Sequence, residues 1–153
     1  MSATLFENAS HSSARAAADA SGASKAAPSA ALRWSGRIAT GIAVAFLAFD
    51  VGIKLSGASA AVKGTTDLGF AASQLLPIGL IELACLVLYL VPRTAPLGAV
   101  LFTGYLGGAI ATHLRLGNPL FTHVLFPIYV AALLWGGLYA RDARVRKLAS
   151  TIL

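Results

Sequence analysis

Residues 71–91 read AASQLLPIGLIELACLVLYLV, and this stretch decides the fold of the protein. It carries one charged residue, Glu82, and is as long as the ~20 apolar residues that cross a ~30 Å hydrocarbon core. Because lipid cannot satisfy open backbone groups, such a stretch crosses a membrane as a helix. The alternation of polar and apolar residues that marks a membrane β-barrel is missing. The stretch therefore predicts a transmembrane helix.

Three further apolar stretches of similar length follow the same pattern, at residues 38–55, 96–114 and 120–140. The 153-residue chain is 57% hydrophobic and 12% charged, whereas soluble domains carry about 25% charged residues. Tight connections at residues 92–95 and 115–119 make consecutive helices antiparallel neighbours. We therefore predict an all-α fold, an integral membrane four-helix bundle within residues 31–147.

The segments outside the helices differ in composition. Residues 1–30 are rich in Ala and Ser and are expected to form a disordered cytoplasmic tail, because they bury too little apolar surface to offset ordering. Residues 148–153 form a C-terminal cytoplasmic tail. The longest connection, residues 56–74, contains glycines that favour irregular backbone, and we expect a short amphipathic segment on the outer surface there.

The basic residues gather on one side of the predicted bundle; those on that side are Arg33, Arg37, Arg93, Arg141, Arg144, Arg146 and Lys147. The other side has Lys63 and Arg115, with Lys54 near the boundary. This positive-inside asymmetry places both termini in the cytoplasm. The net charge of +6 is thus a topology signal that also suits anionic lipid head groups. No nucleic-acid partner is expected, because aromatic residues do not interleave with the basic ones.

Small residues in the apolar stretches have two interpretations. Gly104 and Gly108 stand four apart, a spacing that lets another helix approach closely. The favoured interpretation is packing within the bundle, and the alternative is a homodimer face. Cys85 is the single cysteine, so no intramolecular disulfide forms and a dithiol oxidoreductase is not expected.

Ionisable side chains occur in or beside all four apolar stretches, at similar depth if each residue rises ~1.5 Å. Charges in hydrocarbon are costly, so a chain that keeps them usually uses or pairs them. We therefore take six residues as candidates for ligand binding or proton relay: Asp50, Lys54, Glu82, His113, Arg115 and His123.

Two interpretations of the acidic candidates stay open. Asp50 and Lys54 stand four apart on one helix in the order that favours an ion pair, which is either structural or functional. Glu82 has no partner on its own helix. It is either protonated, because desolvation disfavours the charged form, or paired with Lys54, Arg115 or a histidine. The charges of Asp50, Glu82, Lys54 and Arg115 sum to zero, which favours one shared network.

The two histidines flank the connection at residues 115–119 and are expected to face each other across it. Each is either an interfacial histidine bonded to water or backbone, or part of a site. Pro127 removes the helical hydrogen bond to the carbonyl of His123, so we expect a kink there.

Two kinds of cofactor chemistry fit these residue types. Two histidines and a carboxylate suit iron or zinc, but their spacing matches no established ligand motif, and a metal site is not expected. A quinone needs an apolar slot, a donor to its carbonyl and a group that carries protons. Glu82, His113, His123 and Tyr105 can supply these, although packing is the favoured role of Tyr105. No nucleotide-binding glycine loop or catalytic triad appears, so no catalytic residue is predicted.

Residues 38–147 resemble the DoxX-like family of small bacterial membrane proteins. The matching passages are AFLAFD at residues 45–50 with Lys54, GLIELAC at 79–85, PRTAPLGA at 92–99, GYLGGA at 104–109, THLR at 112–115 and PLFTH at 119–123. The resemblance implies a four-helix protein of the bacterial inner membrane. Because the family takes its name from a subunit of a thiosulfate:quinone oxidoreductase, it also implies a subunit or quinone-side partner in redox chemistry. The alternatives are a small transporter or proton-coupled permeation unit, and a structural or assembly protein.

Overall fold

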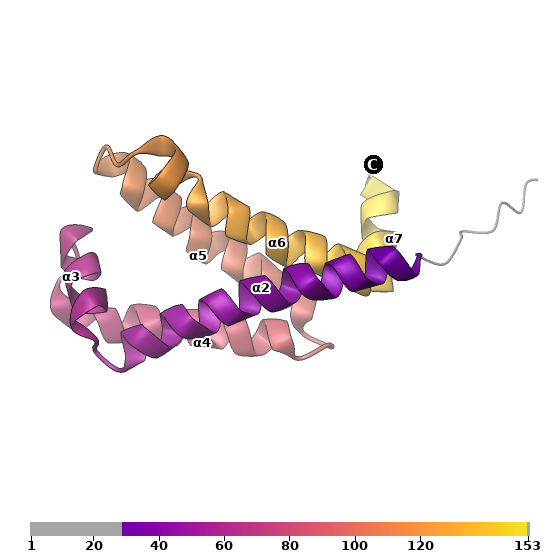
Figure 1. The fold of residues 1–153 in the computed structure, drawn as a ribbon, viewed down its shortest axis with the longest axis horizontal. Helices are drawn as coiled ribbons and strands as arrows, with labels where there is room; N and C mark the ends of the chain where they lie inside the picture. Colours follow the sequence, from indigo (N-terminus) through magenta and orange to yellow (C-terminus); the bar gives the residue numbers. More distant parts are fainter. Residues whose placement is uncertain (1–28, 153) are drawn as a thin grey trace, which may run out of the picture.

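The computed structural model describes residues 29–152, and every regular element in this range is helical (Figure 1). The elements are α2 (Ala30–Leu55), α3 (Ser59–Asp67), η1 (Ala72–Gln74), α4 (Leu75–Leu90), α5 (Ala95–Arg115), η2 (Leu120–Val124), α6 (Phe126–Arg141) and α7 (Ala143–Ile152). Four segments in this range are long and apolar enough to cross a membrane: Ala30–Leu55, Ala72–Leu90, Ala95–Arg115 and Leu120–Arg141. The predicted all-α membrane bundle is confirmed.

The pair α2 and α4 diverges from the pair α5 and α6 toward one end of the molecule (Figure 1). The start of α2, the connection between α4 and α5, and helix α7 gather at one end, here called the α7 end. Helix α3 and the connection between α5 and η2 lie at the opposite end, here called the α3 end. Helices α4 and α5 form a V that opens toward the α3 end. The bundle is therefore narrow at the α7 end and splayed at the α3 end.

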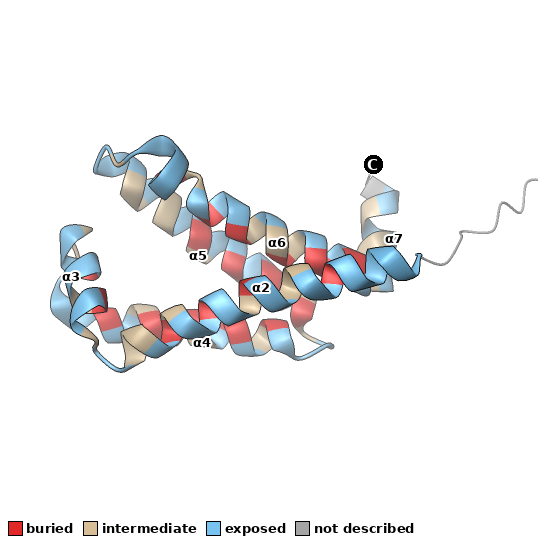
Figure 2. Ribbon diagram, viewed as in Figure 1, coloured by how far each residue is buried: buried red, intermediate tan, exposed pale blue. Residues whose placement is uncertain are grey.

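Small residues hold the helices together near the α7 end. A Cβ atom on Gly36 of α2 would collide with the Cβ of Ala140 on α6, and a Cβ on Gly98 of α5 would collide with the backbone of Tyr89 on α4. Helix backbones approach this closely only where small residues face each other. Tyr89 is fully buried and its hydroxyl donates to the Leu134 carbonyl at 2.8 Å. Buried positions lie where the four long helices face one another (Figure 2).

The first long helix begins earlier than its apolar stretch indicated. Helix α2 starts at Ala30 instead of residue 38, and the Ser29 hydroxyl accepts a hydrogen bond from the Leu32 amide at 3.2 Å. Gly36, in this earlier part of the helix, packs closely against α6, a tertiary contact that hydropathy does not contain. Of the expected N-terminal tail, residues 1–28 lie outside the described residues.

The connection after α2 and the C-terminal segment both contain more helix than the sequence predicts. The amphipathic segment predicted within residues 56–74 is helix α3, bounded by Gly57 and Gly69 with φ of 65° and 82°. At the other end of the bundle, the expected C-terminal tail contributes to helix α7. Asp142 caps this helix, since its Oδ1 accepts from the Arg144 amide at 2.8 Å.

The fourth apolar stretch is interrupted instead of forming one α-helix. Its first turn, η2, is π-helical, and the Leu125 amide donates to the Leu120 carbonyl at 2.9 Å. Helix α6 then begins at Phe126, with Pro127 in its first turn. The break lies where Pro127 predicts one, because proline lacks the amide hydrogen that would continue the ladder.

Candidate functional site

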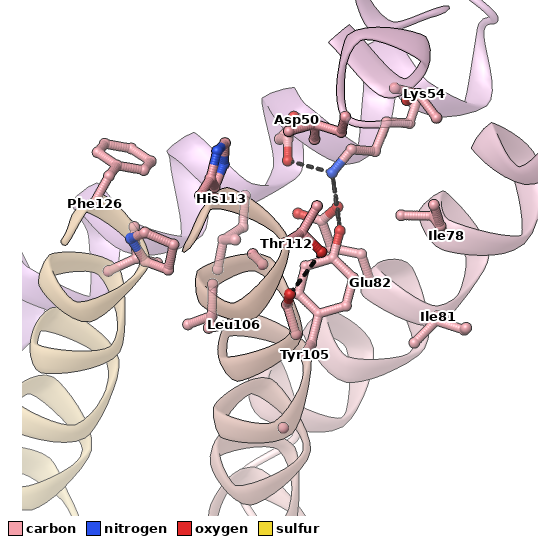
Figure 3. Close-up of a pocket in the computed structure, with 18 of the residues that line it drawn as sticks. Asp50, Lys54, Ile78, Ile81, Glu82, Tyr105, Leu106, Thr112, His113 and Phe126 are labelled. Atoms are coloured by element: carbon pink, nitrogen blue, oxygen red, sulfur yellow. Dashed lines mark hydrogen bonds and ion pairs between the residues drawn. The ribbon is translucent and has the colours of Figure 1, made fainter. Parts of the chain in front are cut away.

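An ionic cluster centred on Lys54 lies between α2, α4 and α5 (Figure 3). The Lys54 ammonium donates to Asp50 Oδ2 at 2.6 Å, to Glu82 Oε2 at 2.6 Å and to the Tyr105 hydroxyl at 2.9 Å. The Tyr105 hydroxyl in turn donates to Glu82 Oε2 at 2.9 Å. Three transmembrane helices are thus joined through one ammonium group.

The cluster becomes more buried from Asp50 to Glu82. The side chains of Asp50 and Lys54 are 28% and 16% exposed, whereas that of Glu82 is 0% exposed. The close approach of α4 to α2 explains this burial, because a Cβ on Gly79 would lie 3.0 Å from the Cβ of Lys54. A glycine one turn before Glu82 lets the carboxylate reach the ammonium. The Asp50–Lys54 ion pair is confirmed, and Glu82 is paired with Lys54.

Beside the cluster is a cavity of about 550 Å³ in the splayed half of the bundle. Its apolar wall is formed by side chains of α2, α4, α5 and α6; among them are Phe46, Ile78, Ile81, Leu106, Phe126 and Val130. Its polar lining includes the four cluster residues and His113. A mostly apolar pocket of this size with a few convergent polar groups is typical of small-molecule sites.

A second hollow of about 550 Å³ lies nearer the α3 end, between α3 and the connection that follows α5. It shares Asp50, Lys54 and His113 with the first cavity, and its own lining includes Asp67 and His123. The Asp50–Lys54 pair therefore stands at the boundary between an apolar cavity inside the bundle and a more polar hollow at its end.

The two histidines meet as their positions in the sequence predict. The ring centroids of His113 and His123 are 5.5 Å apart. Asn118 Nδ2 lies 2.8 Å from His113 Nδ1, and because an amide nitrogen only donates, Nδ1 is the acceptor. With this contact a neutral His113 carries its proton on Nε2, and His113 is among the residues that line the cavity. His123 is exposed, and its Nδ1 lies 2.8 Å from the Thr122 hydroxyl.

Arg115 does not join the cluster. Its Nη2 donates to the Leu68 carbonyl at 3.0 Å and so ties the end of α5 to the end of α3. The prediction of one charge-balanced network that includes Arg115 is therefore wrong. Two carboxylates share a single ammonium instead, which leaves the ionised cluster with one surplus negative charge.

Gly104 and Gly108 have a different role from the favoured packing interpretation. Apart from the chain neighbours and nearby backbone of the same helix, no described atom lies within 4 Å of a Cβ built on either glycine, and both line the cavity. Packing within the bundle is therefore wrong for this pair, because α5 diverges from α4 in the splayed half (Figure 1). The two glycines widen the cavity, and the homodimer face stays a prediction.

Tyr105 is a member of the cluster, although its favoured role from the sequence was packing. A usable signal was present in the sequence. Glu82 lies ten residues before residue 92 and Tyr105 lies ten residues after residue 95, so a tight hairpin at residues 92–95 brings both to the same depth. Within residues 29–152, no group of three or more His, Cys, Asp or Glu side chains is arranged to hold a metal ion.

Comparison with known protein families gives a match. A family model described as the DoxX-like family matches residues 38–137, which include all of α4 and α5 and most of α2 and α6. Neither a curated protein nor a solved structure matches the chain.

Proposed function

The chain belongs to the DoxX-like family, and from its ionic cluster we propose that it binds a quinone-class molecule in the apolar cavity, as a subunit or quinone-side partner in membrane redox chemistry. The single observation that carries the proposal is the fully buried Glu82 in an ion cluster on the cavity wall. The redox role itself follows from family resemblance, and the cavity chemistry supports the ligand class.

The energetic cost of the cluster favours a functional role. A buried ion pair recovers its desolvation penalty only with excellent geometry, and apolar replacements are often neutral or stabilising. Helix packing alone therefore gives little reason to keep Asp50, Lys54 and Glu82 together inside an apolar bundle. Ionisable groups within membrane helices commonly mark ligand or proton pathways.

The cavity offers the three features that a quinone-class ring requires. Phe46, Ile81 and Phe126 supply apolar wall, His113 Nε2 supplies a donor, and the Glu82 carboxylate supplies a group that accepts protons. We also propose that the protein lies in the bacterial inner membrane with both termini cytoplasmic, which places the cavity in the outer half of the bilayer.

Titration of a short-chain quinone into the protein in lipid nanodiscs tests the proposal. Gly108→Leu fills the cavity without altering the cluster, and Gly107→Leu is the matched control because Gly107 is equally uncrowded but does not line the cavity. We expect Gly108→Leu to weaken quinone binding at least tenfold and Gly107→Leu to leave it unchanged. Equal binding by both variants would contradict the proposed location.

A proton-coupled permeation unit is the second candidate function. It is favoured by the Asp50–Lys54 pair at the boundary of two hollows, since such a position suits a relay toward the α3 end. Proton-driven flux in liposomes, lost in Asp50→Asn, would support permeation over quinone binding. Normal complementation by a correctly inserted Asp50→Asn/Glu82→Gln double variant would instead indicate a structural or assembly role.

A further inference from the structure

One oxygen of the buried cluster has no partner. Glu82 Oε1 is inaccessible and forms no hydrogen bond with any described residue, while Glu82 Oε2 accepts from both Lys54 and Tyr105. Leaving a buried polar atom unpaired costs ~1–3 kcal/mol, and more for a charged group. Because Glu82 is among the residues that line the cavity (Figure 3), a bound ligand that reaches this oxygen is its natural partner.

The kind of partner follows from counting the hydrogens of the cluster. A lysine ammonium has three N–H donors and a tyrosine has one O–H donor. The three donors of Lys54 are used by Asp50, Glu82 and Tyr105, and the hydroxyl hydrogen of Tyr105 is used by Glu82. With Glu82 ionised, the cluster therefore has no donor left for a ligand carbonyl. What it presents to the cavity is an acceptor, on a group of atoms with surplus negative charge.

We infer that the ligand held at Glu82 presents a hydroxyl donor, so that the reduced quinol, and not the quinone, is the preferred occupant of the cavity. The identification as a quinol rests on the proposed function, whereas the requirement for a hydroxyl rests on the unpaired oxygen of an ionised Glu82. One hydroxyl of the quinol donates to Glu82 Oε1. The other oxygen of the quinol can accept from His113 Nε2. The contact of Asn118 with His113 Nδ1 favours the tautomer that carries its proton on Nε2.

Two matched series of probes test this preference in nanodiscs by calorimetric titration. The first series is a decyl benzoquinol, the corresponding quinone and the dimethyl ether of the quinol. The second is a decylphenol and its methyl ether, which contain no redox couple. A hydrogen bond to a charged group corresponds to roughly a ten- to hundredfold change in Kd. We expect the quinol to bind tighter than the quinone and the dimethyl ether by that factor. The phenol should bind tighter than its methyl ether by the same factor.

Glu82→Gln should reverse the preference. The glutamine oxygen must take the Oε2 position, because only an oxygen accepts from Lys54 and Tyr105. The amide nitrogen then faces the cavity as a donor, so the variant should bind the quinone at least as tightly as the quinol. Tyr105→Phe is the second variant, and it should raise quinone affinity relative to quinol because it frees one N–H of Lys54. Either variant that keeps the full quinol preference would contradict the assignment.

The outcomes separate the two proposals. Equal affinities for quinol and quinone, or tighter quinone binding, overturn the hydroxyl preference and leave quinone-class binding in place. A phenol preference without binding of either quinone form overturns the proposed function and supports the hydroxyl acceptor. Binding of none of the probes overturns both.

Discussion

Replacing Lys54 with Met isolates the energetic contribution of the ammonium at the centre of the cluster. The methionine keeps most of the apolar stem of lysine, so the packing of α2 against α4 changes little. The substitution removes three hydrogen bonds at once, including the 2.6 Å contact to Glu82. Glu82 then remains fully buried with only the Tyr105 hydroxyl as a donor.

The expected loss of stability follows from the burial of each partner. Removing one member of a buried ion pair costs ~3–5 kcal/mol, because the other charge stays desolvated and unpaired. The Asp50 side chain is 28% exposed, so its ion pair with Lys54 is partly solvated. Asp50→Asn should therefore cost only about 1 kcal/mol of unfolding free energy. Lys54→Met should therefore be several times more destabilising than Asp50→Asn.

A double-mutant cycle in detergent micelles provides the assay. Unfolding free energies are measured for Lys54→Met, for Glu82→Leu and for the double variant, with helicity as the signal. Because the double variant no longer contains the buried unpaired carboxylate, it should recover at least 2 kcal/mol relative to the sum of the single variants. The reasoning would be refuted if the losses of unfolding free energy in the two single variants simply added in the double variant. It would also be refuted if Lys54→Met were as stable as Asp50→Asn or more stable.

Two further predictions concern packing and the C-terminal helix. Gly98→Ala should destabilise the protein by ~1–3 kcal/mol, because its Cβ would collide with the Tyr89 backbone, whereas Gly104→Ala should be nearly neutral in the same unfolding assay. Arg144 hydrogen bonds hold the pKa of Asp142 below its usual value of about 3.9. The contribution of Asp142 to stability should thus be complete at neutral pH and be lost as pH falls below about 3.9 toward the lowered pKa. The difference in thermal midpoint between the wild type and Asp142→Asn, measured from about pH 6 to pH 3, checks this sign; a difference that grows on acidification would contradict it.

Much of the fold follows from hydropathy and turn residues. The apolar stretches predict four crossings. Each crossing must be long enough to span the hydrocarbon core and must form its backbone hydrogen bonds internally. Pro127 marks the break in the fourth stretch, and the i,i+4 spacing of Asp50 and Lys54 predicts their ion pair. These features are local, since each depends on residues within about one helical turn or one span.

The roles of particular small and polar residues were harder to predict from the sequence. The G-x-x-x-G spacing of Gly104 and Gly108 predicts close packing, yet in this chain close packing occurs at Gly36, Gly98 and Gly137 near the α7 end. A glycine is equally compatible with a tight contact and with an open cavity wall. Only the divergence of the helices toward the α3 end distinguishes the two.

The sequence by itself determined that the chain is a helical membrane bundle and that its ionisable residues gather at one depth, because both properties depend on length, hydropathy and rise per residue. The tertiary structure decided which of those residues touch. It placed Tyr105 against Glu82 and Lys54, directed Arg115 to the Leu68 carbonyl, and left one buried Glu82 oxygen without a hydrogen-bond partner among residues 29–152. These outcomes depend on the rotation of each helix about its axis and on the crossing of helices distant in sequence. Both are set by side-chain packing across the whole bundle, which no local pattern contains.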